Sequence, residues 1–110
     1  MDCIFCGIAD GTVPSKKVYQ DDEILAFHDI NPVAPTHILF IPKKHFGSLA
    51  QTTAADAPLL GRLLARVAQT AAELGLTDYR VVSNIGADAG QTVGHLHIHL
   101  LAGCQMAGMI

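Results

Sequence analysis

Between residues 59 and 71, apolar residues recur every three or four positions, which is the spacing of one face of an α-helix. Thr53 stands where an N-terminal capping residue belongs, and Asp56 follows three residues later, as in a capping box. Gly75 suits the left-handed conformation that commonly ends a helix. We therefore predict one long amphipathic helix. Its apolar face would consist of Leu59, Leu60, Leu63, Leu64, Val67, Ala68 and Ala71.

Shorter apolar segments on both sides of this helix predict five β-strands. They cover residues 16–20, 23–29, 37–42, 79–84 and 95–103. Residues 3–10 form a candidate short helix that Gly11 would end, and Pro42 is expected to stop the third strand because proline donates no hydrogen bond to a sheet. This order of elements indicates the α+β class, with a mostly antiparallel five-stranded sheet backed by the long helix. The length fits a single domain over residues 1–110.

Composition narrows the class of protein. Half of the residues are apolar, which argues against disorder. The net charge of −3 argues against nucleic acid as a partner, because proteins that bind its backbone present a basic face. No apolar run approaches the roughly 20 residues of a membrane span, and the first residues, MDCIFCG, lack the pattern of a signal peptide. An odd number of cysteines, three, without an export signal leads us to expect a cytoplasmic protein. Without an apolar span, we expect no membrane partner.

Three of the six histidines fall at alternating positions near the end of the chain, as His95, His97 and His99. On a strand, all three side chains would share one face, and the intervening Leu96, Ile98 and Leu100 would face a core. Three interpretations stay open. The row could bind a metal ion, supply an imidazole nucleophile, or consist of buried structural histidines.

Cys3 and Cys6 form a C-x-x-C motif, whose spacing lets two thiolates reach one ion. The pair could also be a redox couple or two buried cysteines. A tetrahedral zinc site with two additional histidine ligands is the interpretation that we favour. Cys104 stands apart from this motif, and we expect it to be a small buried residue.

Two further segments carry polar groups of ambiguous meaning. The sequence GADAGQTVGH, which contains Gly90, Gln91 and Thr92, offers backbone amides and side-chain donors to an anion, although such a loop is also a common hairpin connection. Asp29 ends a strand and could accept the hydroxyl groups of a ribose. The same residue could equally form an Asx turn before Asn31.

The sequence HLHIHLL matches the signature His-φ-His-φ-His-φ-φ, where φ is apolar, and resembles the histidine triad family. The segments AFHDINPVAPTHILFIPKKH and GQTVGHLHIHLLAGCQM resemble its Hint branch, the histidine triad nucleotide-binding proteins, over nearly the whole chain. This resemblance implies a HIT-like fold and a homodimer. It also implies a hydrolase that binds purine nucleotides and cleaves nucleoside 5′-phosphoramidates and aminoacyl adenylates through a nucleotidyl-histidine intermediate.

The resemblance also assigns roles to residues. His97 would be the nucleophile, His99 would contact the phosphate and His37 would support both. The nucleotide would further contact Phe5, Ile8, Phe27, Asp29, Ile30, Asn84, Gly90, Gln91 and Thr92. A structural zinc ion would be held by Cys3, Cys6, His45 and His95.

Two features depart from close members of that branch. Thr92 stands where they have serine, and the end of this chain, QMAGMI, lacks their tryptophan, so the preference for a leaving group is left open. The alternatives are a dinucleoside polyphosphate hydrolase, a nucleotide-binding scaffold without catalysis, and a three-histidine metalloenzyme.

Overall fold

The computed structural model describes residues 3–106. Five strands form one sheet in the order β1-β2-β3-β5-β4, and every neighbouring pair is antiparallel. The strands are β1 (Lys17–Gln20), β2 (Ile24–His28), β3 (Thr36–Pro42), β4 (Arg80–Val82) and β5 (Ile98–Ala102), and the helices are α1 (Ile4–Asp10) and α2 (Ala57–Glu73). Three 3₁₀ turns complete the described chain: η1 (Leu49–Gln51), η2 (Ala54–Asp56) and η3 (Ala87–Ala89). The predicted α+β class is confirmed, with five strands, one long helix and one short helix.

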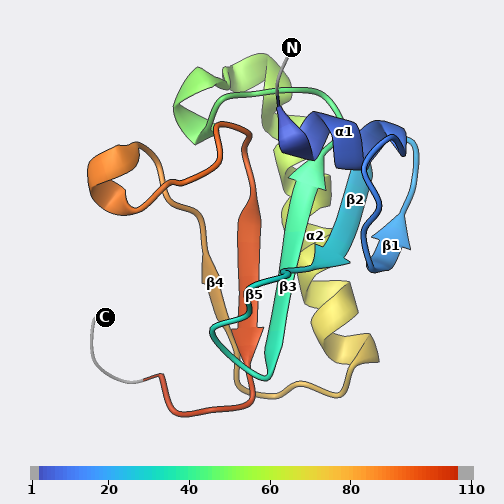
Figure 1. Ribbon diagram of the computed structural model, residues 1–110, viewed down its shortest axis with the longest axis vertical. Coiled ribbons are helices and arrows are strands. Elements are labelled where there is room, and N and C mark those ends of the chain that lie inside the picture. The colour runs from blue at the N-terminus through green and yellow to red at the C-terminus, as the bar shows by residue number, and fades with distance from the viewer. Residues whose placement is uncertain (1–2, 107–110) are drawn as a thin grey trace.

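The two helices cover opposite faces of the sheet, with α2 behind it and α1 in front of its upper end in Figure 1. The face toward α2 carries alternate residues of the central strands, and these form the larger core with one stripe of the helix. Its buried members are Ile24, Ala26, Ile38, Phe40, Leu63, Val67, Ala71, Ile98 and Leu100. Because both faces of β2 and β3 are covered, the sequences of these strands are almost continuously apolar instead of alternating.

The face toward α1 carries a smaller apolar core and then the polar site. Phe5 and Ile8 of α1 pack on Leu25, Phe27, Leu39 and Ile41 of β2 and β3. Phe5 and Phe27 meet edge to face, with ring centroids 5.4 Å apart. Cys3 caps the start of α1 by accepting a hydrogen bond from the Cys6 amide, and Gly11 ends the helix in the left-handed conformation, as predicted.

Two predictions about the extent of elements are wrong. The last strand begins at Ile98 rather than His95, because β3 ends at Pro42 and the Leu96 amide donates instead to the Phe46 carbonyl. The fourth strand spans only Arg80–Val82, shorter than residues 79–84, because its register with β5 ends at Val82 and His99. Residues 95–97 nevertheless keep the alternation of faces that the sequence predicted.

The long helix also differs in detail from its prediction. Thr53 and Asp56 form the expected capping box, but around η2, and α2 follows with proline near its start. Leu64 and Ala68 are exposed, because the side of the helix that packs on the sheet includes fewer residues than the predicted apolar face. Cys104 is exposed rather than buried, because it follows Gly103, where the chain has already left the sheet.

Candidate active site and metal cluster

The alternating histidines lie on the face of the sheet that α1 covers. His95 and His97 are buried beside Phe5, whose ring centroid lies 6.1 Å from that of His95 and 5.2 Å from that of His97. Leu96, Ile98 and Leu100 are buried on the opposite face. The tertiary structure therefore separates the row into two sites, one around His95 and one around His97 and His99.

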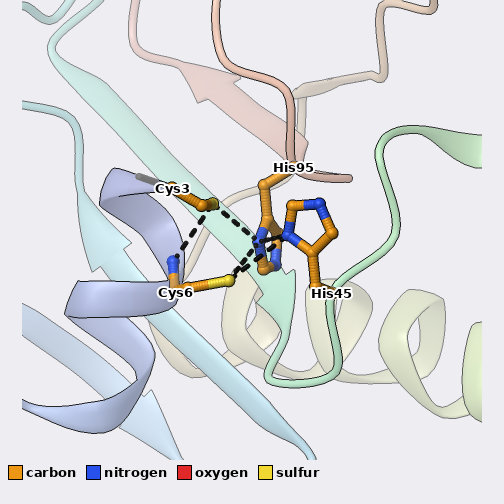
Figure 2. Close-up of side chains that lie close together, drawn as sticks. All are labelled: Cys3, Cys6, His45 and His95. Atoms are coloured by element: carbon orange, nitrogen blue, oxygen red, sulfur yellow. Dashed lines mark hydrogen bonds between the residues drawn. The ribbon is translucent and has the colours of Figure 1, made fainter. Parts of the chain in front are cut away.

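The first site brings two cysteines of the N-terminal segment to two histidines from distant parts of the chain (Figure 2). The Nδ1 atom of His95 lies 3.3 Å from the Cys3 Sγ and 3.5 Å from the Cys6 Sγ. The His45 Nδ1 lies 3.3 Å from the Cys6 Sγ and 3.1 Å from the His95 Nδ1. The four predicted metal ligands thus converge on one point.

The donor set fits a tetrahedral ion. With bonds of about 2.0 Å to nitrogen and about 2.3 Å to sulfur, the edges of a zinc tetrahedron measure about 3.3 to 3.8 Å. The observed separations of 3.1 to 3.5 Å are close to these edges. His95 donates its Nε2–H to the Pro42 carbonyl at 2.9 Å, which leaves the Nδ1 lone pair directed toward the cluster. The four residues can therefore bind a metal ion.

The second site contains an imidazole with a fixed tautomer. The Nδ1 of His97 lies 2.7 Å from the carbonyl oxygen of His95, a distance at which it must donate its proton. The neutral ring then carries an unprotonated Nε2. The Ser83 hydroxyl donates to the His97 carbonyl at 2.8 Å and helps to hold this segment in place. The result is a buried ring that offers one lone pair.

His99 accepts a hydrogen bond from His37 at one ring nitrogen, and its other ring nitrogen is available to a ligand. The Val33 amide donates to the His37 Nδ1 at 3.1 Å, so the His37 Nε2 carries a proton and donates it to the His99 Nδ1 at 2.9 Å. The opposite nitrogen of His99, Nε2, is buried and has no hydrogen-bond partner among residues 3–106. The rings of His97 and His99 are neighbours, with centroids 4.9 Å apart.

Burial keeps His99 neutral near pH 7. It lowers the pKa of His99 to about 4, and the neighbouring His97 and His37 act in the same direction. A neutral ring that accepts at Nδ1 must carry its proton on Nε2. The site therefore presents an Nε2–H of His99 beside the Nε2 lone pair of His97, which is a donor and a nucleophile side by side.

Asp29 completes this second site. One carboxylate oxygen accepts the Asn31 amide at 2.8 Å, which is the predicted Asx turn, and the other lies 3.3 Å from the His37 Nε2. Asp29 and His37 line a cleft of about 430 Å³ that opens to solvent. Of the predicted base-pocket residues, Phe5, Ile8 and Phe27 are buried together, while Ile30 is 88% exposed and lines the same cleft as Asp29.

The glycine-rich loop forms a second cleft, of about 440 Å³, which Gln91 and Thr92 line. The side-chain amide of Gln91 donates to the carbonyls of Gly47 and Val93, and its oxygen accepts the Gly86 amide. Gln91 therefore ties this loop to the segment after β3. Gly90 is left-handed, with a φ of +96°, and Asn84 lies close to it. The contacts of these residues with a nucleotide stay a prediction.

Several groups that define the site were not foreseen from the sequence. They are main-chain atoms: the carbonyls of Pro42 and His95 and the amide of Val33. Every residue offers such a carbonyl, so a sequence contains no signal for the one that fixes a given imidazole. Only the backbone path decides that the His95 carbonyl reaches the His97 ring.

No helix within residues 3–106 is long and apolar enough to cross a membrane.

Comparisons with known proteins agree with this architecture. The family model described as "Scavenger mRNA decapping enzyme C-term binding" matches residues 2–109. Protein HitA of Neisseria gonorrhoeae is 48% identical over 101 residues, which cover 91% of this chain and 94% of that protein. An uncharacterized HIT-like protein of Synechocystis, slr1234, is 50% identical over 103 residues, which cover 93% of this chain and 90% of that protein.

Solved structures show the same likeness. A HIT family hydrolase from Legionella pneumophila superposes with a TM-score of 0.94 at 45% identity, and the match covers 96% of each chain. A histidine triad protein from Clostridium difficile superposes with a TM-score of 0.95 at 47% identity, over 100% of this chain and 97% of that one.

Proposed function

Because this chain belongs to the histidine triad superfamily, as a HIT family hydrolase, we propose that it binds purine nucleotides and hydrolyses nucleoside 5′-phosphoramidates and aminoacyl adenylates. The observation that carries this proposal is the hydrogen bond from the His97 Nδ1 to the His95 carbonyl. It leaves a lone pair on the His97 Nε2 in a site that also offers the Nε2 of His99, which has no hydrogen-bond partner in the described part of the chain.

The proposed reaction has two steps, which share one covalent intermediate. The His97 Nε2 attacks the α-phosphorus and forms an N–P bond, while the bond from phosphorus to the leaving group breaks. A phosphoramidate releases an amine, which takes up a proton from solvent, and an aminoacyl adenylate releases the carboxylate of the amino acid. Water then attacks the same phosphorus, which releases the nucleoside monophosphate and restores His97. The His99 Nε2–H donates to a phosphate oxygen and offsets the charge that develops there, an effect worth roughly 3 kcal/mol for one such donor.

The rest of the proposed nucleotide site follows from what surrounds these rings. Asp29 accepts hydroxyl groups of the sugar, because its carboxylate lines the open cleft beside His37. We assign the base to Phe5, Ile8 and Phe27, which pack together, and to Ile30, which lines the cleft beside Asp29. We assign the phosphate and the leaving group to the loop that contains Asn84, Gly90, Gln91 and Thr92, because Gln91 and Thr92 line an open cleft there.

We propose that the ion bound by the cysteine–histidine cluster is zinc. Two thiolates and two imidazoles form a donor set that zinc favours, and a closed shell of four protein ligands leaves no position for a catalytic water. An ion held by these four residues would cross-link α1, the segment after β3 and the approach to β5. Since Phe5 of α1 contacts the His97 ring, this cross-link also holds one wall of the active site.

Detection of the covalent intermediate tests the proposed function. We expect adenosine 5′-phosphoramidate, quenched in acetonitrile during turnover, to leave an added AMP on the peptide that contains His97, as measured by mass spectrometry. Turnover of diadenosine tetraphosphate in parallel identifies the alternative. A faster reaction with the dinucleotide than with the phosphoramidate, through the same adduct, would assign the chain to the polyphosphate hydrolases. No adduct and no turnover of either compound would refute the proposal.

We also propose that the protein is a homodimer formed through β4 and the neighbouring part of α2. β4 stands at an edge of the sheet, and an apolar cleft of about 310 Å³ lies between it and the helix. Leu49, Leu64 and Val81 line this cleft and are each more than 40% exposed. An apolar surface beside an unpaired strand edge is suited to a second copy of itself.

The oligomeric state tests this interface. Leu64→Glu is expected to convert the dimer to a monomer in light scattering coupled to gel filtration, because it places a charge in the apolar cleft. Leu74→Glu serves as the matched control, since Leu74 is 50% exposed at the far end of the helix and outside the cleft. A monomeric wild-type protein, or a dimer that Leu64→Glu leaves intact, would exclude this surface.

A further inference from the structure

We infer that Asp29 is a positioning residue that couples binding of the nucleoside sugar to the tautomer of His99. The inference rests on the proposed function and extends it from recognition of the sugar to the rate of the chemical step. It follows from one feature of the site, namely that the His37 Nε2 is hydrogen-bonded to His99 and also lies 3.3 Å from a carboxylate oxygen of Asp29.

The hydrogen bonds of His37 leave no freedom in its protonation. The Val33 amide occupies the Nδ1, which therefore accepts, and the proton of the neutral ring must lie on the Nε2. That one Nε2–H faces the His99 Nδ1 at 2.9 Å and the nearer oxygen of Asp29 at 3.3 Å. The side chain of His37 is 4% exposed, so water does not compete for this proton. This proton is hydrogen-bonded to His99, and the negative charge of the nearby Asp29 carboxylate also attracts it.

A ligand can weaken the attraction of Asp29 for this proton. The Asp29 side chain is 20% exposed, and its cleft is open, whereas its other oxygen is already held by the Asn31 amide. Sugar hydroxyl groups that donate to the nearer oxygen reduce its pull on the His37 proton. The His37 N–H then donates to His99 with less competition.

The consequence reaches the reacting phosphate through His99. When His37 donates to the Nδ1 of His99, the proton of the neutral His99 ring stays on the Nε2, beside His97. If that donation weakens, the proton can move to Nδ1, and the Nε2 lone pair then repels the phosphate oxygens. A bound sugar therefore favours the tautomer of His99 that the reaction needs.

The same three groups satisfy the spacing of a metal site, since their ligand atoms all lie within 4.8 Å of one another. Coordination through the His37 Nε2 would require that nitrogen to lose its proton. The proton would move to Nδ1, where it would face the Val33 N–H at 3.1 Å, donor against donor. The Val33 amide therefore favours a hydrogen-bonded chain over a bound ion.

A direct test uses a ligand without phosphate. We expect saturating adenosine to shift the imidazole ¹⁵N resonances of His99 toward the pattern of the Nε2–H tautomer, and saturating 2′,3′-dideoxyadenosine to leave them nearer to those of the free protein. Equal resonances with the two nucleosides would overturn the inference. Broadening or loss of activity on addition of Mn²⁺, abolished by Asp29→Asn, would show a metal site instead.

A kinetic test separates positioning from binding. For the wild-type protein, we expect kcat to fall about tenfold when the ribose of the phosphoramidate is replaced by 2′,3′-dideoxyribose, in addition to a rise in KM. In Asp29→Asn, the amide nitrogen replaces the oxygen that competes for the His37 proton, while the remaining oxygen still accepts from Asn31. The dependence of kcat on the sugar should therefore collapse to about onefold.

The controls keep the two proposals distinguishable. Asp22→Asn makes the same change of charge at an exposed turn before β2 and should retain the tenfold effect of the sugar on kcat. A wild-type protein in which the sugar changes only KM would refute the coupling and leave the proposed function standing. A wild-type protein that hydrolyses neither substrate would refute the proposed function.

Discussion

Replacement of His97 by alanine is expected to lower kcat for adenosine 5′-phosphoramidate by about 10⁴-fold or more, because it removes the group that forms the intermediate. The ring is buried at the centre of the site, and within residues 3–106 no hydrogen bond occupies the lone pair of its Nε2. Steady-state hydrolysis, measured as release of AMP, gives the rate. The dissociation constant for AMP should change only a few-fold, because the proposed contacts to the base and the sugar come from other residues.

A rescue experiment distinguishes lost chemistry from a damaged fold. In His97→Gly, free imidazole can enter the space left by the side chain and attack the same phosphorus, which would release adenylyl-imidazole. We expect millimolar imidazole to restore part of the rate in this variant and to have little effect on the wild type. An alanine variant with near-normal turnover would exclude His97 as the nucleophile.

The second large effect concerns the metal cluster. Cys3→Ser is expected to lose the zinc ion and at least about 3 kcal/mol of unfolding free energy, because binding to a preformed site contributes directly to stability. For a chain of this size, such a loss corresponds to a melting temperature lower by about 12 °C or more. Elemental analysis of the purified protein measures the metal, and calorimetry measures the transition.

The chain contains its own control for this experiment. Cys104 is exposed and lies outside the cluster, so Cys104→Ser should keep one zinc ion per chain and the melting temperature of the wild type. A Cys3→Ser variant that retains stoichiometric zinc would show that the cluster is not the site. A wild-type protein without metal, purified in the absence of chelators, would refute the assignment of zinc.

The fold was largely predictable from the sequence because each element depends on local signals. The stripe of Leu63, Val67 and Ala71 and the glycines that end each helix are properties of adjacent residues, and both appear where expected. The ends of β4 and β5 were not predictable. They depend on where a partner strand stops, which is a long-range property.

The four residues of the metal cluster were predicted from the family resemblance. In the structure, their ligand atoms lie close enough together to bind one ion. Nothing within the C-x-x-C motif states that its partners are His45 and His95, which lie 39 and 89 residues from Cys6. Ile30 illustrates the opposite limit. It is apolar, yet it lies on an exposed loop. Its assignment to a base pocket therefore depends on contact with a bound ligand, which the neighbouring sequence cannot reveal.

By itself, the sequence determined which residue types are available and which face of the chain each one shares, because alternation and helical spacing are built into the backbone. It thereby placed three histidines on one side and leucine and isoleucine on the other. Only the tertiary structure decided what each histidine does. The carbonyls of Pro42 and His95 and the amide of Val33 fix the tautomers of His95, His97 and His37, and these main-chain groups acquire their positions only when the sheet assembles.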